Sequence, residues 1–368
     1  MSSLRTLSVG AAALGLAVAM ASSGHAADVT KAKLYPDKKG TVADFLPITK
    51  FCGTKPIKVA LSDGWGGNYW RHITRAEFED EASKCKNITE TRYTDGEFKP
   101  EKQIADIEGL IAQKFDVIVA FLDTGAAVLK ATREATAAGV AVVPYSVGDN
   151  FPGKIGVDYV DRVTESQSEV GQQFAEWLAK TLNGKGTVIM FGGTPGNPMT
   201  AAQVVGWKPT FAKYPGIKVL EADPVPTNWD PAMAQQKTAA LIAKYPEIDG
   251  IYSETTGPIR AFIAAGKPVP AYVGQSLMDL SCLAADGKFK MASMDAHTWM
   301  VRLALRKAVA AAQGIDESEP SLITLPYTED NTSKDAKLAI KCDKSMPMDS
   351  IPSSMLSKDQ QVKALGGK

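Results

Sequence analysis

The sequence predicts an α/β protein built from two similar, doubly wound lobes, each with a parallel sheet covered by helices. Three observations support this prediction. Short runs rich in β-branched residues alternate with segments of helical periodicity, which is typical of a parallel sheet with helices on both faces. The same order of runs occurs twice, with equivalent strands about 130 residues apart. Most loops that follow the predicted strands carry aromatic or polar side chains.

The predicted elements follow one another in the same order in both halves. In the first half we expect strands at residues 57–61, 88–93, 116–122 and 140–145, with helices that end near Lys84, Gln113 and Ala138. In the second half we expect strands at 187–192, 217–222, 249–253 and 271–275, with helices that end near KYPG (213–216), KYPE (244–247) and Ala265. Asp230 followed by Pro231 supplies an N-cap and a proline at the first helical position.

The first 26 residues have the pattern of a secretory signal peptide. Arg5 precedes an apolar run at residues 9–21, and small residues precede a predicted cleavage point after about Ala26. The apolar run is too short to span a bilayer as a helix. We therefore expect an exported, periplasmic protein, in which residues 27–55 form an N-terminal extension.

The charge balance bears on the class of partner. The chain has 41 Lys and Arg against 41 Asp and Glu, and among these only Arg5 leaves with the predicted signal. Such a balance provides no general positive field for nucleic acid or for an anionic membrane. We therefore expect a small-molecule partner and no nucleic-acid partner.

All four cysteines, Cys52, Cys85, Cys282 and Cys342, follow the predicted cleavage point. An even number in an oxidising compartment favours disulfides. Cys52 precedes the first strand, and Cys85 ends the helix that returns antiparallel to it, so we predict a Cys52–Cys85 bond, which leaves Cys282 with Cys342. Free buried cysteines or a metal site are the alternatives, although the spacing matches no zinc pattern.

The loops after the strands identify the candidate site. In open parallel sheets, ligands bind where loops converge at the carboxyl ends of the strands. This rule selects loops that carry a large share of the big aromatic side chains: Trp65, Tyr69, Trp70, Tyr145 and Trp229. If the two lobes face each other across these edges, the rings line a shared cleft instead of lying exposed to water.

Short segments of the sequence carry a resemblance to a known family. They are NYWR (68–71), GVAVVPYS (139–146), QVVG (203–206) and MASMD (291–295). With these segments and the order of its elements, the chain resembles the type I periplasmic solute-binding proteins, in particular the ribose-like group that serves sugar ABC importers. The resemblance implies a two-lobed clamp with a hinge of several crossing strands, which closes on a small solute and docks on a permease in the inner membrane.

The same resemblance implies a division of the chain. We expect an N-lobe at residues 56–156 plus 296–325, a C-lobe at 157–295 plus 326–345, and a C-terminal tail at 346–368.

Several positions depart from the ribose-like pattern. Ser146 stands where the family has a charged residue that grips hydroxyls, Gln203 replaces an arginine, and Thr255 replaces an asparagine. Ser276 replaces an aspartate, and Asp295 replaces the hinge glutamine. Because most of the usual charged sugar clamps are absent, we expect a small neutral polar solute, such as a sugar or a polyol.

The candidate ligand-binding residues combine aromatic rings, which pack on the apolar faces of sugars, with polar groups that bond hydroxyls. They are Trp65, Asn68, Trp70, Arg71, Asp123, Tyr145, Ser146, Gln203, Trp229, Glu254, Thr255, Gln275, Ser276 and Asp295.

Many of these candidates also have a structural interpretation. Each of the three tryptophans can pack into the core of its own lobe, and Tyr145 can pack at the hinge. Asn68 can cap the helix that follows it. Arg71 can pair with Glu254 or Asp295 across the cleft instead of holding an acidic ligand. Asp123 can be a helix cap.

We predict no cofactor, no metal and no enzymatic activity. In GWGGNY, Tyr69 occupies the third glycine position of a dinucleotide fingerprint, and the other glycine-rich turns lack the ending of a phosphate loop. Asp295 and His297 form half of a triad, but no nucleophile with a distinctive setting accompanies them.

The main hypothesis is therefore a monomeric periplasmic substrate-binding component of an ABC importer, which works by hinge closure. A ligand sensor that presents its closed form to a chemoreceptor or histidine kinase would use the same physics. A secreted α/β enzyme is the third hypothesis.

Overall fold

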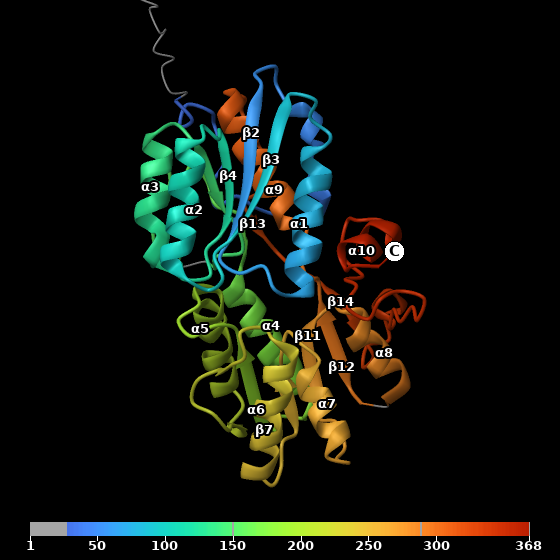
Figure 1. Cartoon of the computed structure of the whole chain (residues 1–368). Helices are drawn as coiled ribbons and strands as arrows, with labels where there is room; N and C mark the ends of the chain where they lie inside the picture. The colour runs from blue at the N-terminus through green and yellow to red at the C-terminus, as the bar shows by residue number, and fades with distance from the viewer. Residues whose placement is uncertain (1–27, 149–150, 288, 368) are drawn as a thin grey trace, which may run out of the picture.

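The computed structural model describes residues 28–148, 151–287 and 289–367. The predicted signal peptide therefore lies outside the described residues. The chain forms two lobes stacked along one long axis, and its C-terminal segment lies beside their junction (Figure 1). Within the described ranges, no helix is long and apolar enough to cross a bilayer.

The first lobe contains a parallel sheet with the spatial order β3-β2-β4-β5. Its strands are β2 (Ile57–Asp63), β3 (Ile88–Asp95), β4 (Val117–Phe121) and β5 (Ala141–Pro144). Its helices are α1 (Tyr69–Ala82), α2 (Pro100–Ala112), α3 (Leu129–Ala137, preceded by the 3₁₀ turn Gly125–Val128) and the late helix α9 (Met300–Gln313). Helices α2 and α3 pack together, as do α1 and α9, so that one pair covers each face of the sheet (Figure 1). Every residue of β4 is buried, as expected for a strand covered on both faces.

The second lobe repeats this arrangement and extends it. Its sheet has the order β8-β7-β10-β11-β12-β14, with β9 beside β7 and the edge strand β14 antiparallel. The strands are β7 (Lys185–Gly192), β8 (Gly216–Val219), β9 (Val225–Pro226), β10 (Gly250–Tyr252), β11 (Ala271–Gln275), β12 (Met291–Met294) and β14 (Tyr327–Asp330). The helices are α4 (Gln167–Thr181), α5 (Pro198–Ala212), α6 (Pro231–Lys244), α7 (Gly257–Ala264) and α8 (Met278–Gly287).

In both lobes the first strand lies between the second and the third, and the fourth follows the third. This shared order confirms the predicted doubly wound α/β fold. The helix starts also agree with the sequence, because the side chain of Asp230 accepts a hydrogen bond from the amide of Met233 and caps α6. The exact lobe boundaries remain predictions.

A small parallel sheet joins the crossing segments between the lobes. Strand β13 (Leu322–Ile323) lies between β1 (Lys39–Gly40) and β6 (Thr164–Glu165). Strand β6 follows the first lobe's sheet in sequence, and β13 leads from α9 back to β14. The N-terminal extension thus adds a strand to the hinge, and its 3₁₀ turns Val42–Asp44 and Ile48–Lys50 lie just before the first lobe in the chain.

Helix α9 is buried along its whole length. Its Arg302 pairs with Glu77 and Glu81 of α1, which are buried as well. Pairing of this kind removes much of the cost of placing charges away from water. Glu77 is therefore held in place on the first lobe by its contact with Arg302.

Both predicted disulfides are confirmed. The Cα atoms of Cys52 and Cys85 lie 5.3 Å apart, and those of Cys282 and Cys342 lie 4.6 Å apart. The first bond joins the N-terminal extension to the end of α1. The second joins α8 to the segment after β14.

Candidate functional site

A pocket with about 420 Å³ of empty space, including its mouth, lies between the lobes. The first lobe and the crossing segment line it with Asn68, Tyr69, Trp70, Arg71, Phe121 and His297. The second lobe lines it with Met199, Trp229, Glu254 and Gln275. Most of these residues stand at the carboxyl ends of strands or at the start of the next helix, where open parallel sheets bind ligands.

Arg71 lies on the first lobe's side of the pocket and is held by carboxylates. It is only 3 % exposed, and its guanidinium nitrogens lie 2.9 Å from an oxygen of Asp63 and 2.9 Å from an oxygen of Asp123. Its guanidinium also lies over the ring of Phe121, 3.4 Å from the ring centre. Arg71 is thus paired with acidic side chains, as its structural interpretation predicted. The predicted partners were wrong, because the acids are Asp63 and Asp123 and not Glu254 or Asp295.

Burial dominates the protonation of these carboxyls. It raises the pKa of Asp63 to about 6 and that of Asp123 to about 7, while Arg71 acts in the opposite direction. The hydroxyls of Tyr93 and Tyr145 lie 3.2 Å and 3.5 Å from the carboxylate of Asp63. Asp123 therefore supports Arg71 from behind the pocket, and it caps no helix, since Thr124 holds the N-cap position of the next turn.

Glu254 is the centre of a polar network on the second lobe's side. Among the described residues it accepts hydrogen bonds from neutral donors: Tyr252 at 2.7 Å, Gln203 at 3.1 Å, Gln275 at 3.2 Å, and the indole NH of Trp229. These bonds fix the orientation of its carboxylate, and the residue as a whole is partly exposed. Gln203 is itself held by Gln167 at 2.8 Å, so it supports Glu254 and is absent from the pocket lining.

Trp229 reaches the pocket from a loop with an uncommon backbone shape. Asn228 and Trp229 both have positive φ angles, of 53° and 54°. Gly193 makes room for the indole, because a Cβ atom there would lie 2.2 Å from the ring. The loop thus directs the ring toward Glu254, and Trp229 is only 9 % exposed.

Trp70 and Tyr69 connect the lobes at the start of α1. The indole NH of Trp70 donates to the carbonyl of Ala296 at 2.7 Å, and its ring meets Phe121 edge-on. The hydroxyl of Tyr69 donates to the backbone carbonyl of Glu254 at 3.3 Å, across the pocket. Asn68 precedes them and accepts from the amide of Arg71 at 2.9 Å, so it caps α1 and also lines the pocket.

His297 lines the pocket beside the hinge. Its Nε2 lies 3.2 Å from Glu165, and its backbone amide donates to Asp295 at 2.7 Å. Asp295 also accepts from the indole NH of Trp299. Burial raises the pKa of Asp295. Asp295 thus organises the crossing segment and lies outside the pocket lining.

The remaining candidates are absent from the pocket lining. Trp65 stacks on Phe98 of its own lobe, with ring centres 4.4 Å apart. Tyr145 is fully buried, and the hydroxyl of Ser146 bonds the sulfur of Met300 at 3.4 Å. Thr255 and Ser276 are buried as well.

No group of three or more His, Cys, Asp or Glu within the described ranges is placed to hold a metal ion.

A periplasmic binding protein domain matches residues 59–316 of the chain. The chain belongs to this family. The predicted resemblance is thereby confirmed.

Three relatives show how this periplasmic binding protein compares with known ones. The xylitol-binding protein of Mycolicibacterium smegmatis is 25 % identical over 259 residues, which cover 68 % of this chain and 72 % of the relative. An ABC transporter solute binding protein from Thermobispora bispora has a TM-score of 0.67 at 21 % identity, covering 85 % of this chain and 97 % of its own. An ABC transporter solute binding protein from Bacillus halodurans with bound myo-inositol has a TM-score of 0.64 at 18 % identity, covering 74 % of this chain and 94 % of its own. The two solved structures share the fold of this chain.

Sequence reasoning missed several residues of the pocket region. Phe121 ends an apolar strand and has the pattern of a core residue, while Met199 begins a helix without any distinctive signal. Asp63 ends the first strand beside the predicted loop, so a search for acids near Arg71 could have found it. In the sequence, His297 stands out only as half of a catalytic triad and not as a residue of the binding pocket, which it lines.

Proposed function

We propose that this chain is the periplasmic substrate-binding component of an ABC importer and that it takes a small neutral sugar or polyol into the interlobe pocket. The observation that carries this proposal is the composition of the pocket. Aromatic rings from both lobes surround groups that bond hydroxyls, and Arg71, which lines the pocket, is already paired with Asp63 and Asp123.

The pocket offers two kinds of contact to a polyol. The rings of Trp70 and Trp229 provide apolar faces for C–H groups. Asn68, Gln275 and the exposed part of Glu254 provide acceptors and donors for hydroxyls. Enclosure between the lobes strengthens these bonds because it removes competing water.

The charges in the pocket disfavour an acidic ligand. Around it stand the cation Arg71 and the carboxyls of Asp63, Asp123 and Glu254. A carboxylate ligand would add a further negative charge near Glu254, in a partly dehydrated space where repulsion between like charges is strong. A neutral ligand avoids this cost.

Closure of the hinge is the proposed mechanism. The pocket draws its lining from both lobes, so a ligand that contacts both stabilises the closed arrangement over the open one. The bond from Tyr69 to the carbonyl of Glu254 is an example of a contact that forms only when the lobes approach. The closed form would then be recognised by the permease.

The family and the relatives support the wider assignment. One relative is a xylitol-binding protein, and a solved structure of the same fold contains myo-inositol. Two solved structures of the same fold are ABC transporter solute binding proteins, which supports a role in import. We further propose a monomer whose signal peptide is removed after about Ala26, and we assign it no catalytic role.

A calorimetric titration of the purified mature chain tests the proposal. Xylitol, myo-inositol, allitol and ribose serve as neutral ligands, and xylonate serves as a matched acidic one. We expect saturable binding of at least one neutral compound and none of xylonate. A bound ligand at a hundredfold excess over its Kd would also stabilise the fold by about 2.7 kcal/mol, which a thermal shift detects. Binding of xylonate alone would contradict the proposal and make Arg71 the anchor.

A further inference from the structure

The C-terminal segment runs from one lobe to the other. After β14, the chain returns to α8 at the Cys282–Cys342 bond, and then continues to α10 (Lys358–Ala364), which lies beside α1 of the first lobe (Figure 1). We define residues 343–367 as the strap.

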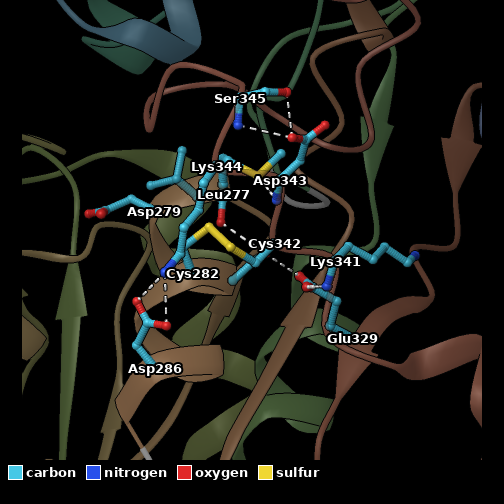
Figure 2. Close-up of a disulfide and its surroundings, with 12 residues drawn as sticks. Leu277, Asp279, Cys282, Asp286, Glu329, Lys341, Cys342, Asp343, Lys344 and Ser345 are labelled. Atoms are coloured by element: carbon cyan, nitrogen blue, oxygen red, sulfur yellow. Dashed lines mark hydrogen bonds and ion pairs between the residues drawn. A yellow bond between two sulfur atoms is a disulfide. The ribbon is translucent and has the colours of Figure 1, made fainter.

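The strap is fixed to the second lobe at its first end. Figure 2 shows Cys342 bonded to Cys282, Lys344 paired with Asp286 at 2.9 Å, and the amide of Lys341 donating to Glu329 at 2.7 Å. The carbonyl oxygens of Met348 and Ser350 accept from the amides of Asp279 and Met278, respectively, at 2.8 Å and 2.9 Å. Backbone amides at the start of a helix have no partner within the helix, so the strap caps α8.

The other end of the strap is fixed to the first lobe. The hydroxyl of Ser354 donates to Glu77 of α1 at 2.5 Å, and the amide of Met355 donates to the same oxygen at 2.8 Å. Gln360 donates to Asp80 at 2.8 Å. Because Glu77 is buried and paired with Arg302, this end is attached to a rigid part of the lobe.

The middle of the strap is buried at the junction. Ile351 is 1 % exposed and Leu356 is 6 % exposed, and both belong to an apolar cluster that contains Ile73 of α1 and Leu277 beside α8. The hydroxyl of Ser353 accepts from the amide of Ala296, on the crossing segment, at 3.1 Å. The strap therefore touches both lobes and the hinge.

From this arrangement, we propose that the strap holds the lobes together on this side and biases their equilibrium toward the arrangement seen here. Its last bond to α8 is at Ser350 and its first bond to α1 is at Ser354. These four residue steps span at most about 14 Å when extended, and Pro352 restricts the backbone within them. Opening beyond that reach breaks the contacts at one end and exposes Ile351 and Leu356 to water.

The strap also meets the helix that carries the pocket residues. Tyr69, Trp70 and Arg71 belong to the first turn of α1, and the strap contacts the same helix at Glu77 and Asp80. Movement of α1 away from the second lobe and release of the strap are therefore coupled. The inference does not depend on which ligand the pocket takes.

Double electron–electron resonance measures the distance between two spin labels and tests the role of the strap without any ligand. The labels are attached at Lys130→Cys in the first lobe and at Ala265→Cys in the second, both exposed positions. One variant ends the chain after Ser350, which keeps the disulfide and the bonds to α8. A second variant, Ser354→Ala with Gln360→Ala, removes the side-chain bonds to Glu77 and Asp80 of α1, together with two local bonds from the amides of Leu356 and Ser357. Lys363→Ala, an exposed position of α10, is the matched control.

We expect longer and broader interlobe distances in the truncated chain, a smaller shift in the double variant, and no shift in the control. Circular dichroism establishes whether each variant is folded. If the truncated chain is unfolded, the interlobe distances of the double variant decide whether the proposal holds. Distance distributions equal to those of the parent chain would overturn the proposal. A failure to bind any sugar would leave this comparison unaffected, so it separates the strap from the proposed function.

Discussion

At the scale of single residues, Arg71 shows how one side chain can line a pocket and still belong to the fold. Both ends of its guanidinium are taken by carboxylates of its own lobe, and a ring lies against its face. Removing one member of a buried ion pair typically costs about 3–5 kcal/mol, because the other charge is left without a partner. Arg71 therefore presents a fixed donor surface to the pocket and little free positive charge.

The carboxyls around Arg71 make stability depend on pH. Burial raises the pKa of Asp123 from its ordinary value of 3.8 to about 7, so the folded chain holds a proton that the unfolded chain has already released. The stability from this group is complete below about pH 4 and is lost as the pH rises through about 7.

We expect Asp123→Asn to remove this dependence. As the pH rises from 4 to 7, the free energy of unfolding of the parent should fall relative to that of the variant by about 1.4 kcal/mol per pH unit. Urea unfolding of both proteins at several pH values measures the difference. A constant difference between the two curves would show that Asp123 does not titrate in this range.

A second prediction at this scale concerns two tryptophans. Trp229→Phe keeps an aromatic ring but removes the bond to Glu254, so we expect the affinity for the bound solute to fall about tenfold, as for the loss of one hydrogen bond to a charged group. Trp65→Phe is the matched control, because Trp65 stacks on Phe98 outside the pocket. Titration calorimetry of both variants is the measurement, and an equal loss in both would refute the assignment of the pocket.

At the scale of elements, the site is made by the first turns of helices and the last residues of strands. Asn68 ends the loop after β2, caps α1, and so fixes where Tyr69, Trp70 and Arg71 point. A helix cap of this kind contributes about 1 kcal/mol to stability. The same geometry leaves the asparagine at the pocket's edge.

Substitutions at Asn68 separate its two roles. Asn68→Ala should lower the free energy of unfolding by about 1 kcal/mol and also weaken binding. Asn68→Asp should keep the cap and the stability, since an aspartate accepts the same bond and its charge suits a helix N-terminus, but it should weaken binding because the amide donor is lost. Thermal unfolding of both variants measures their stability, and titration measures their affinity for the solute. If the aspartate variant binds as well as the parent, Asn68 acts through the helix alone.

The elements themselves were predictable to different degrees. The strands at 57–61 and 271–275 and the helix after Asp230 were identified because their patterns are local. We assigned no helix to residues 300–313, where α9 is buried along its whole length and even Arg302 and Lys307 lie inside. The helix nevertheless has a clear amphipathic period, with Arg302 and Arg306 four residues apart, so its signal was present in the sequence and was missed.

At the scale of the whole molecule, the crossing segments join the two lobes, and each disulfide fixes a terminal segment to one lobe. The disulfides close loops between residues that are 33 and 60 positions apart. In the chain-entropy account, loops of this size stabilise the fold by about 4 kcal/mol each. One bond ties the N-terminal extension to α1, and the other fixes the strap to α8.

Removal of each bond should therefore lower stability by a similar amount. We expect paired serine substitutions at Cys52 and Cys85, or at Cys282 and Cys342, to lower the unfolding free energy by about 4 kcal/mol, slightly more for the second pair because its loop is longer. Denaturant unfolding measures this, and the parent chain in reductant should resemble the quadruple variant. Unchanged stability after loss of either pair would contradict the account.

The sequence by itself determined the repeated α/β order, the pairing of the cysteines, and the loops that meet between the lobes. These features follow from local periodicity, from turn residues and from the rule that loops converge at strand ends. Of the candidate ligand-binding residues, Asn68, Trp70, Arg71, Trp229, Glu254 and Gln275 line the pocket, and their contact with a ligand stays a prediction.

Only the tertiary structure decided which of the neighbouring side chains face the pocket. Trp65 and Trp70 lie on the same loop and helix start, yet Trp65 stacks on Phe98 of its own lobe while Trp70 lines the pocket. The partners of Arg71, and the attachment of the strap to Glu77, join residues that are far apart in the chain. Such contacts depend on how the lobes and the strap pack, and local sequence patterns carry no record of that packing.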